Sequence, residues 1–189
     1  QHIAATALAL IAEHGLPGVS MSLLARRAGI ARATLYNYFP DLESVLAAVV
    51  ADQVSALTTR LRHDLDPVTD PAEQLDRTLR TLLGWLARRP RTGNHTDPVG
   101  RLSPDVIATL HEPLDRLREL VRDILERGVA DSTFDAIIDP ALHAEFIIRL
   151  LFGLDTHNAG ARRRHAIGDQ LPRFVLRGLG HDITTVETT

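Results

Sequence analysis

The chain has 189 residues, of which 44% are apolar and 24% charged, and its formal net charge at pH 7 is −3. These values are ordinary for a globular protein and allow one sizeable core with a smaller one appended to it. Cysteine is absent, which excludes disulfides and thiolate metal sites. No uninterrupted apolar run approaches the ~20 residues needed to cross a bilayer, so we expect a cytoplasmic protein with no membrane partner.

Three short helices are predicted at the N-terminal end. Apolar residues recur at helical spacing from Ile3 to Ile11, and Gly15 suits the left-handed position that ends such a helix. Ser20 is a suitable N-cap for a second helix that reaches residue 28. Gly29 then allows the chain to turn into a third helix over residues 32–38.

The second and third helices have the spacing of a helix-turn-helix, in which the second helix enters the major groove of DNA. Ala25 is small enough for the helices to approach, while Ile30 and Leu35 close the inner face. The outward side chains carry donors, acceptors and rings that can bond base edges and phosphates. These side chains are Arg32, Thr34, Tyr36 and Asn37. A helical hairpin whose polar face is merely solvated is the simpler alternative.

The run GIARATLYNYFPDLESVL, residues 29–46, resembles the recognition region of TetR-type transcriptional regulators. The resemblance covers about residues 3–50 and implies an all-α fold. A three-helix DNA-binding head, residues 1–46, would be joined by a long helix to an effector-binding and dimerisation domain, residues 47–189. The residues that it implies for contact with operator DNA are Ser20, Ser22, Arg32, Ala33, Thr34, Tyr36, Asn37 and Tyr38.

The rest of the chain is also predicted to be helical. A fourth helix begins after Pro40, with Asp41 as its N-cap, and keeps one face apolar for about seven turns up to Leu65. Further helices are expected over residues 71–88, 104–111 and 112–129. Residues 88–104 are rich in proline, glycine and polar side chains, and are interpreted either as a surface loop or as a gate over a pocket.

Residues 140–158 form an unusual predicted helix, because FIIRLLFGL is apolar almost all round. Such a helix needs its own core on one side and an apolar partner on the other. In the last helix, which ends near Gly180, Pro172 marks either a kink or the true start. We expect these two helices to form a homodimer with twofold symmetry, and the resemblance implies the same interface.

The resemblance also implies a small-molecule effector bound among the helices of the C-terminal domain. Polar and aromatic candidates for its site are Thr78, Thr81, Trp85, His111, Phe146 and Arg149. Each has a simpler interpretation: core packing for Trp85, an interface ion pair for Arg149 and surface exposure for His111.

The predicted function is a ligand-responsive regulator, a repressor that releases a palindromic operator when a small apolar or amphipathic molecule binds. The sequence has no catalytic motif and no zinc-ligand spacing, so no enzyme, metal or cofactor is predicted. A helical small-molecule-binding protein or enzyme with a vestigial head is the alternative. It rests on the formally neutral charge of residues 1–46 and on Leu42, where the family has a phosphate-binding lysine.

Overall fold

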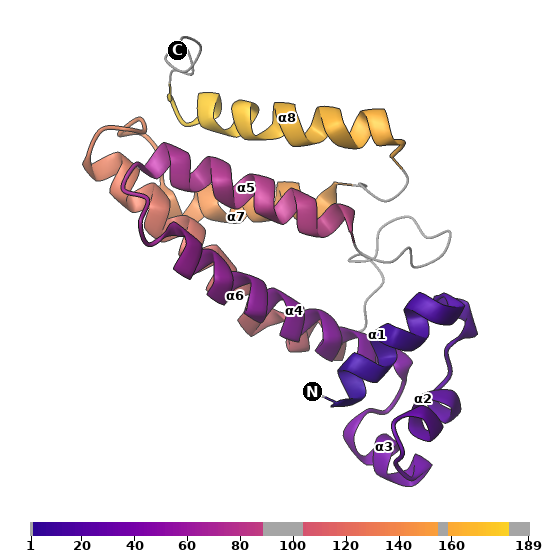
Figure 1. Ribbon diagram of the computed structural model, residues 1–189. Helices are drawn as coiled ribbons and strands as arrows, with labels where there is room; N and C mark the ends of the chain where they lie inside the picture. The colour runs from indigo at the N-terminus through magenta and orange to yellow at the C-terminus, as the bar shows by residue number, and fades with distance from the viewer. Residues whose placement is uncertain (1, 89–103, 155–158, 182–189) are drawn as a thin grey trace. The chain divides into compact units, whose positions relative to one another are not determined.

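The computed structural model describes residues 2–88, 104–154 and 159–181, and within these ranges it is helical with no strand (Figure 1). The prediction of an all-α fold is confirmed. A short 3-10 turn, Leu16–Gly18, follows the first helix. The α-helices are α1 (His2–His14), α2 (Met21–Arg27), α3 (Arg32–Tyr38), α4 (Leu42–Leu65), α5 (Pro71–Ala87), α6 (Pro104–Ala130), α7 (Pro140–Gly153) and α8 (Ala161–Gly178).

The chain divides into two compact units. Unit 1 comprises residues 1–57 and 90–115, and unit 2 comprises residues 58–89 and 116–189. The long helices α4 and α6 each contribute residues to both units. The predicted boundary at residue 46 separates a DNA-binding domain from an effector-binding and dimerisation domain. A division into compact units does not test that separation of functions, so the boundary stays a prediction.

Local sequence signals explain how the helices of unit 1 begin and end. Gly15 and Gly29 have φ angles of +69° and +68°, a conformation that favours glycine. Ser20 caps α2 because its hydroxyl oxygen accepts the backbone N–H of Leu23 at 3.2 Å. Asp41 caps α4 in the same way, accepting the Ser44 backbone N–H at 2.7 Å. The predicted turns and caps are therefore confirmed.

The core of unit 1 is a small apolar cluster drawn from four helices. Leu10 of α1, Leu24 of α2 and Leu35 of α3 are completely buried, and Val45 and Val49 of α4 pack against them. Leu35 is the one residue of α3 that is buried. The position of α3 therefore depends strongly on this single side chain.

Among the described residues, α4 is the one helix long and apolar enough to cross a bilayer by length and composition. The sequence contains no uninterrupted apolar run of that length, but the mean hydropathy of a helix can be high even when the helix contains a few charged residues. One such helix is weak evidence for a membrane span, since the core helix of a globular protein has the same character. Here Val45 and Val49 lie in the core of unit 1, and Arg62 lies 3.7 Å from Asp123 of α6.

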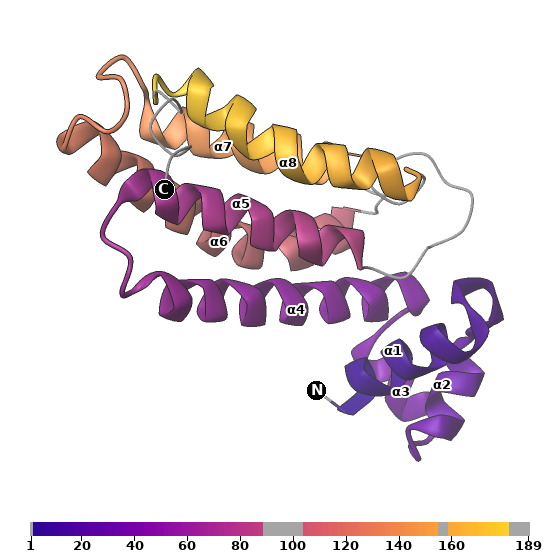
Figure 2. The same cartoon turned by 45° about the horizontal axis from the view of Figure 1, so that its top comes forward.

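Unit 2 is organised around α5, which lies beside α8 and contacts α7 (Figures 1 and 2). Its leucine face is buried as predicted, with Leu75, Leu79 and Leu82 fully inaccessible. The predicted inward face of α6 is buried as well, through residues such as Leu117 and Ile124.

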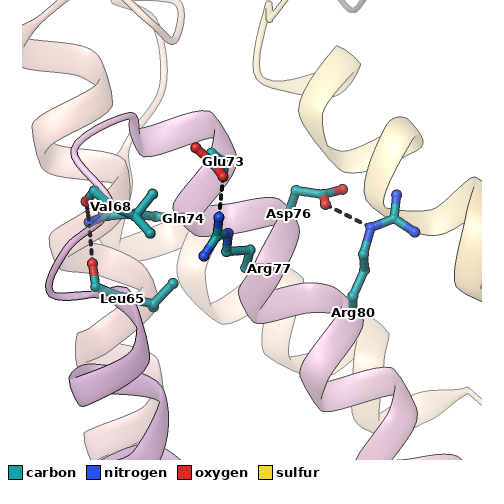
Figure 3. A network of polar contacts seen from close by, with 7 residues as sticks. All are labelled: Leu65, Val68, Glu73, Gln74, Asp76, Arg77 and Arg80. Atoms are coloured by element: carbon teal, nitrogen blue, oxygen red, sulfur yellow. Dashed lines mark hydrogen bonds and ion pairs between the residues drawn. The ribbon is translucent and has the colours of Figure 1, made fainter. Parts of the chain in front are cut away.

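A buried polar side chain fixes the turn between α4 and α5 (Figure 3). Gln74 donates from Nε2 to the carbonyl oxygens of Leu65, at 3.3 Å, and Val68, at 2.5 Å. Its Oε1 accepts from Arg127 of α6 at 2.5 Å. Because every polar atom of the buried amide has a partner, these hydrogen bonds offset the cost of its desolvation while the side chain ties the end of α4 to α5 and α6.

The prediction of two helices between residues 104 and 129 is wrong, because α6 is continuous and Pro113 lies inside it. A proline costs a helix one hydrogen bond and a clash, on the order of 3 kcal/mol. Burial of Pro113 and of the apolar residues that follow it offsets this cost.

The two C-terminal helices also differ from the prediction in their limits. Helix α7 ends at Gly153, and residues 155–158, predicted as its continuation, lie outside the described residues. Pro172 is inside α8, so it does not mark the start of that helix. The predicted loop or gate falls mainly on residues 89–103, which also lie outside the described residues.

Candidate DNA-binding and effector sites

Helix α3 presents its polar residues to the surface over a single buried anchor. Leu35 is fully buried, whereas Arg32, Thr34 and Asn37 are exposed. Tyr36 is 41% exposed. The helix therefore offers a guanidinium, an amide and hydroxyl groups to a partner, which are the groups that bond base edges and phosphates.

Arg32 and Tyr36 are one helical turn apart and contact each other. Arg32 Nη2 donates to the Tyr36 hydroxyl at 3.3 Å, and its guanidinium carbon lies 5.4 Å from the centre of the tyrosine ring. Such contacts restrict the rotamers of both side chains. The guanidinium keeps its other N–H groups for a further partner because it has five donors in all.

The other predicted DNA contacts are exposed on α2 and α3 or next to them. Ser20, Ser22 and Ala33 are exposed, and Tyr38 is 72% exposed. The Ser20 hydroxyl accepts the capping bond and still has its own hydrogen to donate. The nearby Arg27 is engaged within the unit, since its Nη2 bonds Glu13 at 2.8 Å. Of the two exposed arginines at the end of α2, Arg26 and Arg27, Arg27 is therefore the less available to a partner.

Three predicted effector residues lie along α5. Thr78 is completely buried, and its hydroxyl donates to the Gln74 carbonyl oxygen at 2.8 Å. Thr81 and Trp85 are half-buried. The Trp85 ring meets the Phe152 ring of α7 edge to face, with centres 6.3 Å apart. This contact was not predicted, because helical periodicity identifies the face of a residue but not the residue opposite.

Two other predicted effector residues, His111 and Arg149, each pair with a carboxylate on their own helix. His111 is exposed on α6, and its Nδ1 lies 2.7 Å from an Asp115 carboxylate oxygen. Arg149 is exposed and bonds Glu145, one turn away on α7, at 2.7 Å. Surface exposure, the simpler interpretation, describes His111, whereas the ion pair of Arg149 lies within α7 and the predicted interface ion pair stays a prediction. In the part of the chain that is described, no cluster of three His, Asp or Glu side chains is suited to a metal ion.

Phe146 belongs to an apolar surface on α7 and α8, which we call the α7/α8 face: Leu142, Phe146, Leu150 and Phe174. Phe146 is 54% exposed and Phe174 is 69% exposed. Phe174 lines two hollows. One has a volume of about 380 Å³ and is also lined by Leu171, and the other has a volume of about 140 Å³ and is also lined by Leu150. The opposite side of α7 is buried in unit 2, as the sequence predicts for an apolar helix with two partners.

Comparisons with protein families agree with this arrangement. Residues 3–49 match the family model described as "Bacterial regulatory proteins, tetR family". Residues 68–179, more than half of the chain, match that of "Tetracyclin repressor-like, C-terminal domain".

Relatives with known roles include two repressors. The HTH-type transcriptional repressor KstR2 of Mycolicibacterium smegmatis is 29% identical over 146 residues, which span 75% of this chain and 70% of that protein. The HTH-type transcriptional repressor KstR of Rhodococcus jostii is 26% identical over 125 residues, which span 66% of this chain and 57% of that protein.

Solved structures share the fold over nearly the whole chain. FadR of Bacillus subtilis, in complex with stearoyl-CoA, has a TM-score of 0.72 at 21% identity and covers 94% of this chain and 97% of its own. RolR in complex with resorcinol has a TM-score of 0.69 at 25% identity and covers 97% of this chain and 88% of its own. With matched models for both its N-terminal and C-terminal parts, the chain belongs to the TetR family of DNA-binding transcriptional regulators.

Proposed function

We propose that this regulator is a homodimeric repressor that binds a palindromic operator through α3 and releases it when a small apolar or amphipathic molecule binds in unit 2. The observation that carries the proposal is the two-sided character of α3. Leu35 anchors the helix, and the side chains around it are polar, exposed and spaced for a groove.

In the proposed complex, α3 lies in the major groove. Arg32 is suited to the O6 and N7 acceptors of guanine, and Asn37 to the N6 and N7 groups of adenine. Thr34 and Tyr36 contact neighbouring base edges, and the Ala33 methyl group can pack against a thymine methyl group. Ser20, Ser22 and Tyr38 bond phosphate oxygens and so fix the position of the head on the duplex.

The proposed dimer uses the α7/α8 face. Four exposed apolar side chains beside two hollows form a patch that a lone chain would leave in water. A twofold axis places the same patch on both protomers, so Phe174 of one protomer can fill a hollow of its partner. Fixed spacing of the two heads then suits half-sites about 34–36 Å apart, or a multiple of that distance.

The proposed effector site includes Thr78, Thr81 and Trp85, with Phe152 opposite Trp85. Phe146 and Arg149 join this site only if their present contacts rearrange, and His111, which belongs to unit 1, is not part of it. Two proteins of this fold, FadR and RolR, were solved with the small organic ligands stearoyl-CoA and resorcinol, which supports an effector without identifying it. To shift the DNA-binding equilibrium from 1:99 to 99:1, an effector must prefer one state by ~10⁴-fold, or ~5.5 kcal/mol.

A regulator with this role acts in the cytoplasm, where its operator is. The test is binding of the purified protein to the palindromes upstream of its own gene, at several salt concentrations. Selective binding that weakens as salt rises, and that Arg32→Ala weakens further while the dimer persists, supports the proposal. Indifference to DNA at low salt, combined with tight binding of a small molecule in a thermal-shift screen, would favour a ligand-binding protein with a vestigial head.

A further inference from the structure

Helix α8 contains a break in its hydrogen bonding at Pro172, which is buried inside the helix. A helical proline has no N–H to donate to the carbonyl oxygen four residues earlier, and its ring pushes that carbonyl aside. In α8 this carbonyl belongs to Gly168. It therefore needs a donor from outside the helix or from water.

Arg80 of α5 supplies such a donor. Its Nη1 lies 3.5 Å from the Gly168 carbonyl oxygen in hydrogen-bonding geometry, while its Nε bonds Asp76 Oδ2 at 2.7 Å. The bond to Asp76 raises the pKa of the guanidinium, burial opposes that rise, and the nearby Asp169 carboxylate adds to it. The guanidinium is thus held on its own helix by Asp76 and directed at the break in α8.

Figure 3 shows that Arg80 extends on the side of α5 where α8 runs, whereas Arg77 turns toward Glu73. Arg77 and Glu73 form the same kind of pair one turn apart, with a nitrogen–oxygen distance of 2.5 Å. Within the described residues, Arg77 has no hydrogen bond to α8. Helix α5 therefore carries two similar ion pairs, Glu73–Arg77 and Asp76–Arg80, and the arginine of the second pair also donates to the Gly168 carbonyl oxygen of α8.

We infer that Arg80 is a positioning residue of the dimer surface, which replaces the N–H that Pro172 lacks and thereby holds the two turns of α8 around Pro172 in place. Phe174 lies two residues beyond Pro172 and is exposed between the two hollows of the α7/α8 face. Because the direction of Phe174 depends on how α8 passes Pro172, Arg80 acts on the dimer through Phe174 without touching the partner protomer. This inference rests on the proposed dimer.

The test is a double-mutant cycle in the full chain between Arg80→Met and Pro172→Ala. Methionine keeps the apolar stem of the arginine and removes the donor, while alanine returns a backbone N–H to position 172. We would measure the dimer dissociation constant by sedimentation equilibrium and the hydrogen exchange of the α8 amides. Arg77→Met is the matched control, since it breaks the similar pair that does not reach α8.

We expect Arg80→Met to raise the dimer dissociation constant about 5-fold, the low end for an acceptor left without its bond, because Arg80 is partly exposed. The same change in the Pro172→Ala background, and Arg77→Met alone, should each change it less than about 2-fold. The exchange of α8 amides should follow the same pattern.

An equal effect of Arg80→Met in both backgrounds, or an effect no larger than that of Arg77→Met, would overturn the inference. A wild-type chain that stays monomeric would instead contradict the proposed dimer. In that case the exchange rates alone decide about Arg80: acceleration that Pro172→Ala reverses would support the capping bond, and equal rates would refute it.

Discussion

Two surfaces of the molecule expose aromatic rings to a similar extent but differ in chemistry. On α3, Tyr36 and Tyr38 are 41% and 72% exposed, and on the α7/α8 face Phe146 and Phe174 are 54% and 69% exposed. The tyrosines carry hydroxyl groups and suit a partner that is polar and hydrated, such as DNA. The phenylalanines have no polar atom and suit an apolar partner, such as a second copy of the chain.

The two surfaces also differ in their support. Helix α3 has seven residues and rests on the single buried residue Leu35, whereas α7 has fourteen residues and buries four: Ala144, Ile147, Ile148 and Leu151. Exposure by itself therefore does not identify a partner. The neighbours of an exposed ring indicate what it binds, and the residues beneath it determine how easily the surface is lost.

The largest expected effect is on the apolar surface. Phe174→Glu should weaken the dimer by about 1000-fold or more, because burying a carboxylate in an apolar interface costs several kcal/mol. Sedimentation velocity measures the change. Ile137→Glu is the control, since Ile137 is 84% exposed and lies before α7, outside the face defined above. Equal dimerisation of both variants would show that the face is not the interface.

The next effect concerns the support of α3. Leu35→Ala should lower the free energy of unfolding of the head by about 2–5 kcal/mol, because it leaves a cavity under the helix. Operator binding should fall with it. Urea unfolding followed by circular dichroism tests this, with the half-buried Leu23→Ala as a milder control. If the two variants lose the same stability, α3 does not depend on a single anchor.

A smaller effect is expected from the polar groups on α3. Arg32→Ala should weaken operator binding about 5- to 150-fold, the range for one good base contact, and leave the free energy of unfolding nearly unchanged. Tyr36→Phe removes only the hydroxyl that accepts from Arg32 and should cost less. Fluorescence anisotropy with labelled operator measures both. Arg77→Ala, which removes the same charge from unit 2, should bind normally; a matching loss there would mean that only net charge counts.

The smallest effect concerns the start of α4, which supplies Val45 and Val49 to the core beneath α3. The backbone N–H of Ser44 bonds the Asp41 carboxylate and holds the pKa of Asp41 below its usual value of 3.8. The charge therefore stabilises the folded state above the unfolded pKa, and this contribution is lost as the pH falls through the lower folded value. Asp41→Asn should cost about 0.5 kcal/mol at pH 7.

Unfolding of the Asp41→Asn variant and the wild type at pH 7 and below pH 3.8 tests this dependence. The difference between them should be constant above that value and disappear at lower pH. Asp52→Asn, in the middle of the same helix, is the control for the loss of a negative charge away from the cap. A difference that persists in acid would assign the effect to geometry and not to charge.

Much of the fold was predictable because its signals are local. Ser20 and Asp41 cap helices by bonding amides three residues away, and Gly15 and Gly29 adopt left-handed angles that other residues disfavour. The apolar face of α5 follows from helical periodicity alone.

The features that the sequence did not reveal depend on partners far along the chain. Pro113 and Pro172 are tolerated inside helices because of surrounding packing and, for Pro172, a donor from Arg80. The contacts of Trp85 with Phe152 and of Gln74 with Arg127 depend on how neighbouring helices are aligned, which periodicity does not specify. Candidate effector residues were therefore identified by type and face, without their neighbours.

The most direct measurement is a titration of the operator region upstream of its own gene with the wild-type protein and the Arg32→Ala variant, at about 50 to 200 mM salt. We expect the wild type to bind a palindrome as a dimer, more tightly than unrelated DNA and with an affinity that falls as salt rises. The Arg32→Ala variant should remain dimeric and bind the palindrome about 5- to 150-fold more weakly. Wild-type protein with no preference for the palindrome at the lowest salt, or a variant that binds as well as the wild type, would contradict the assignment of α3 as the DNA-reading helix.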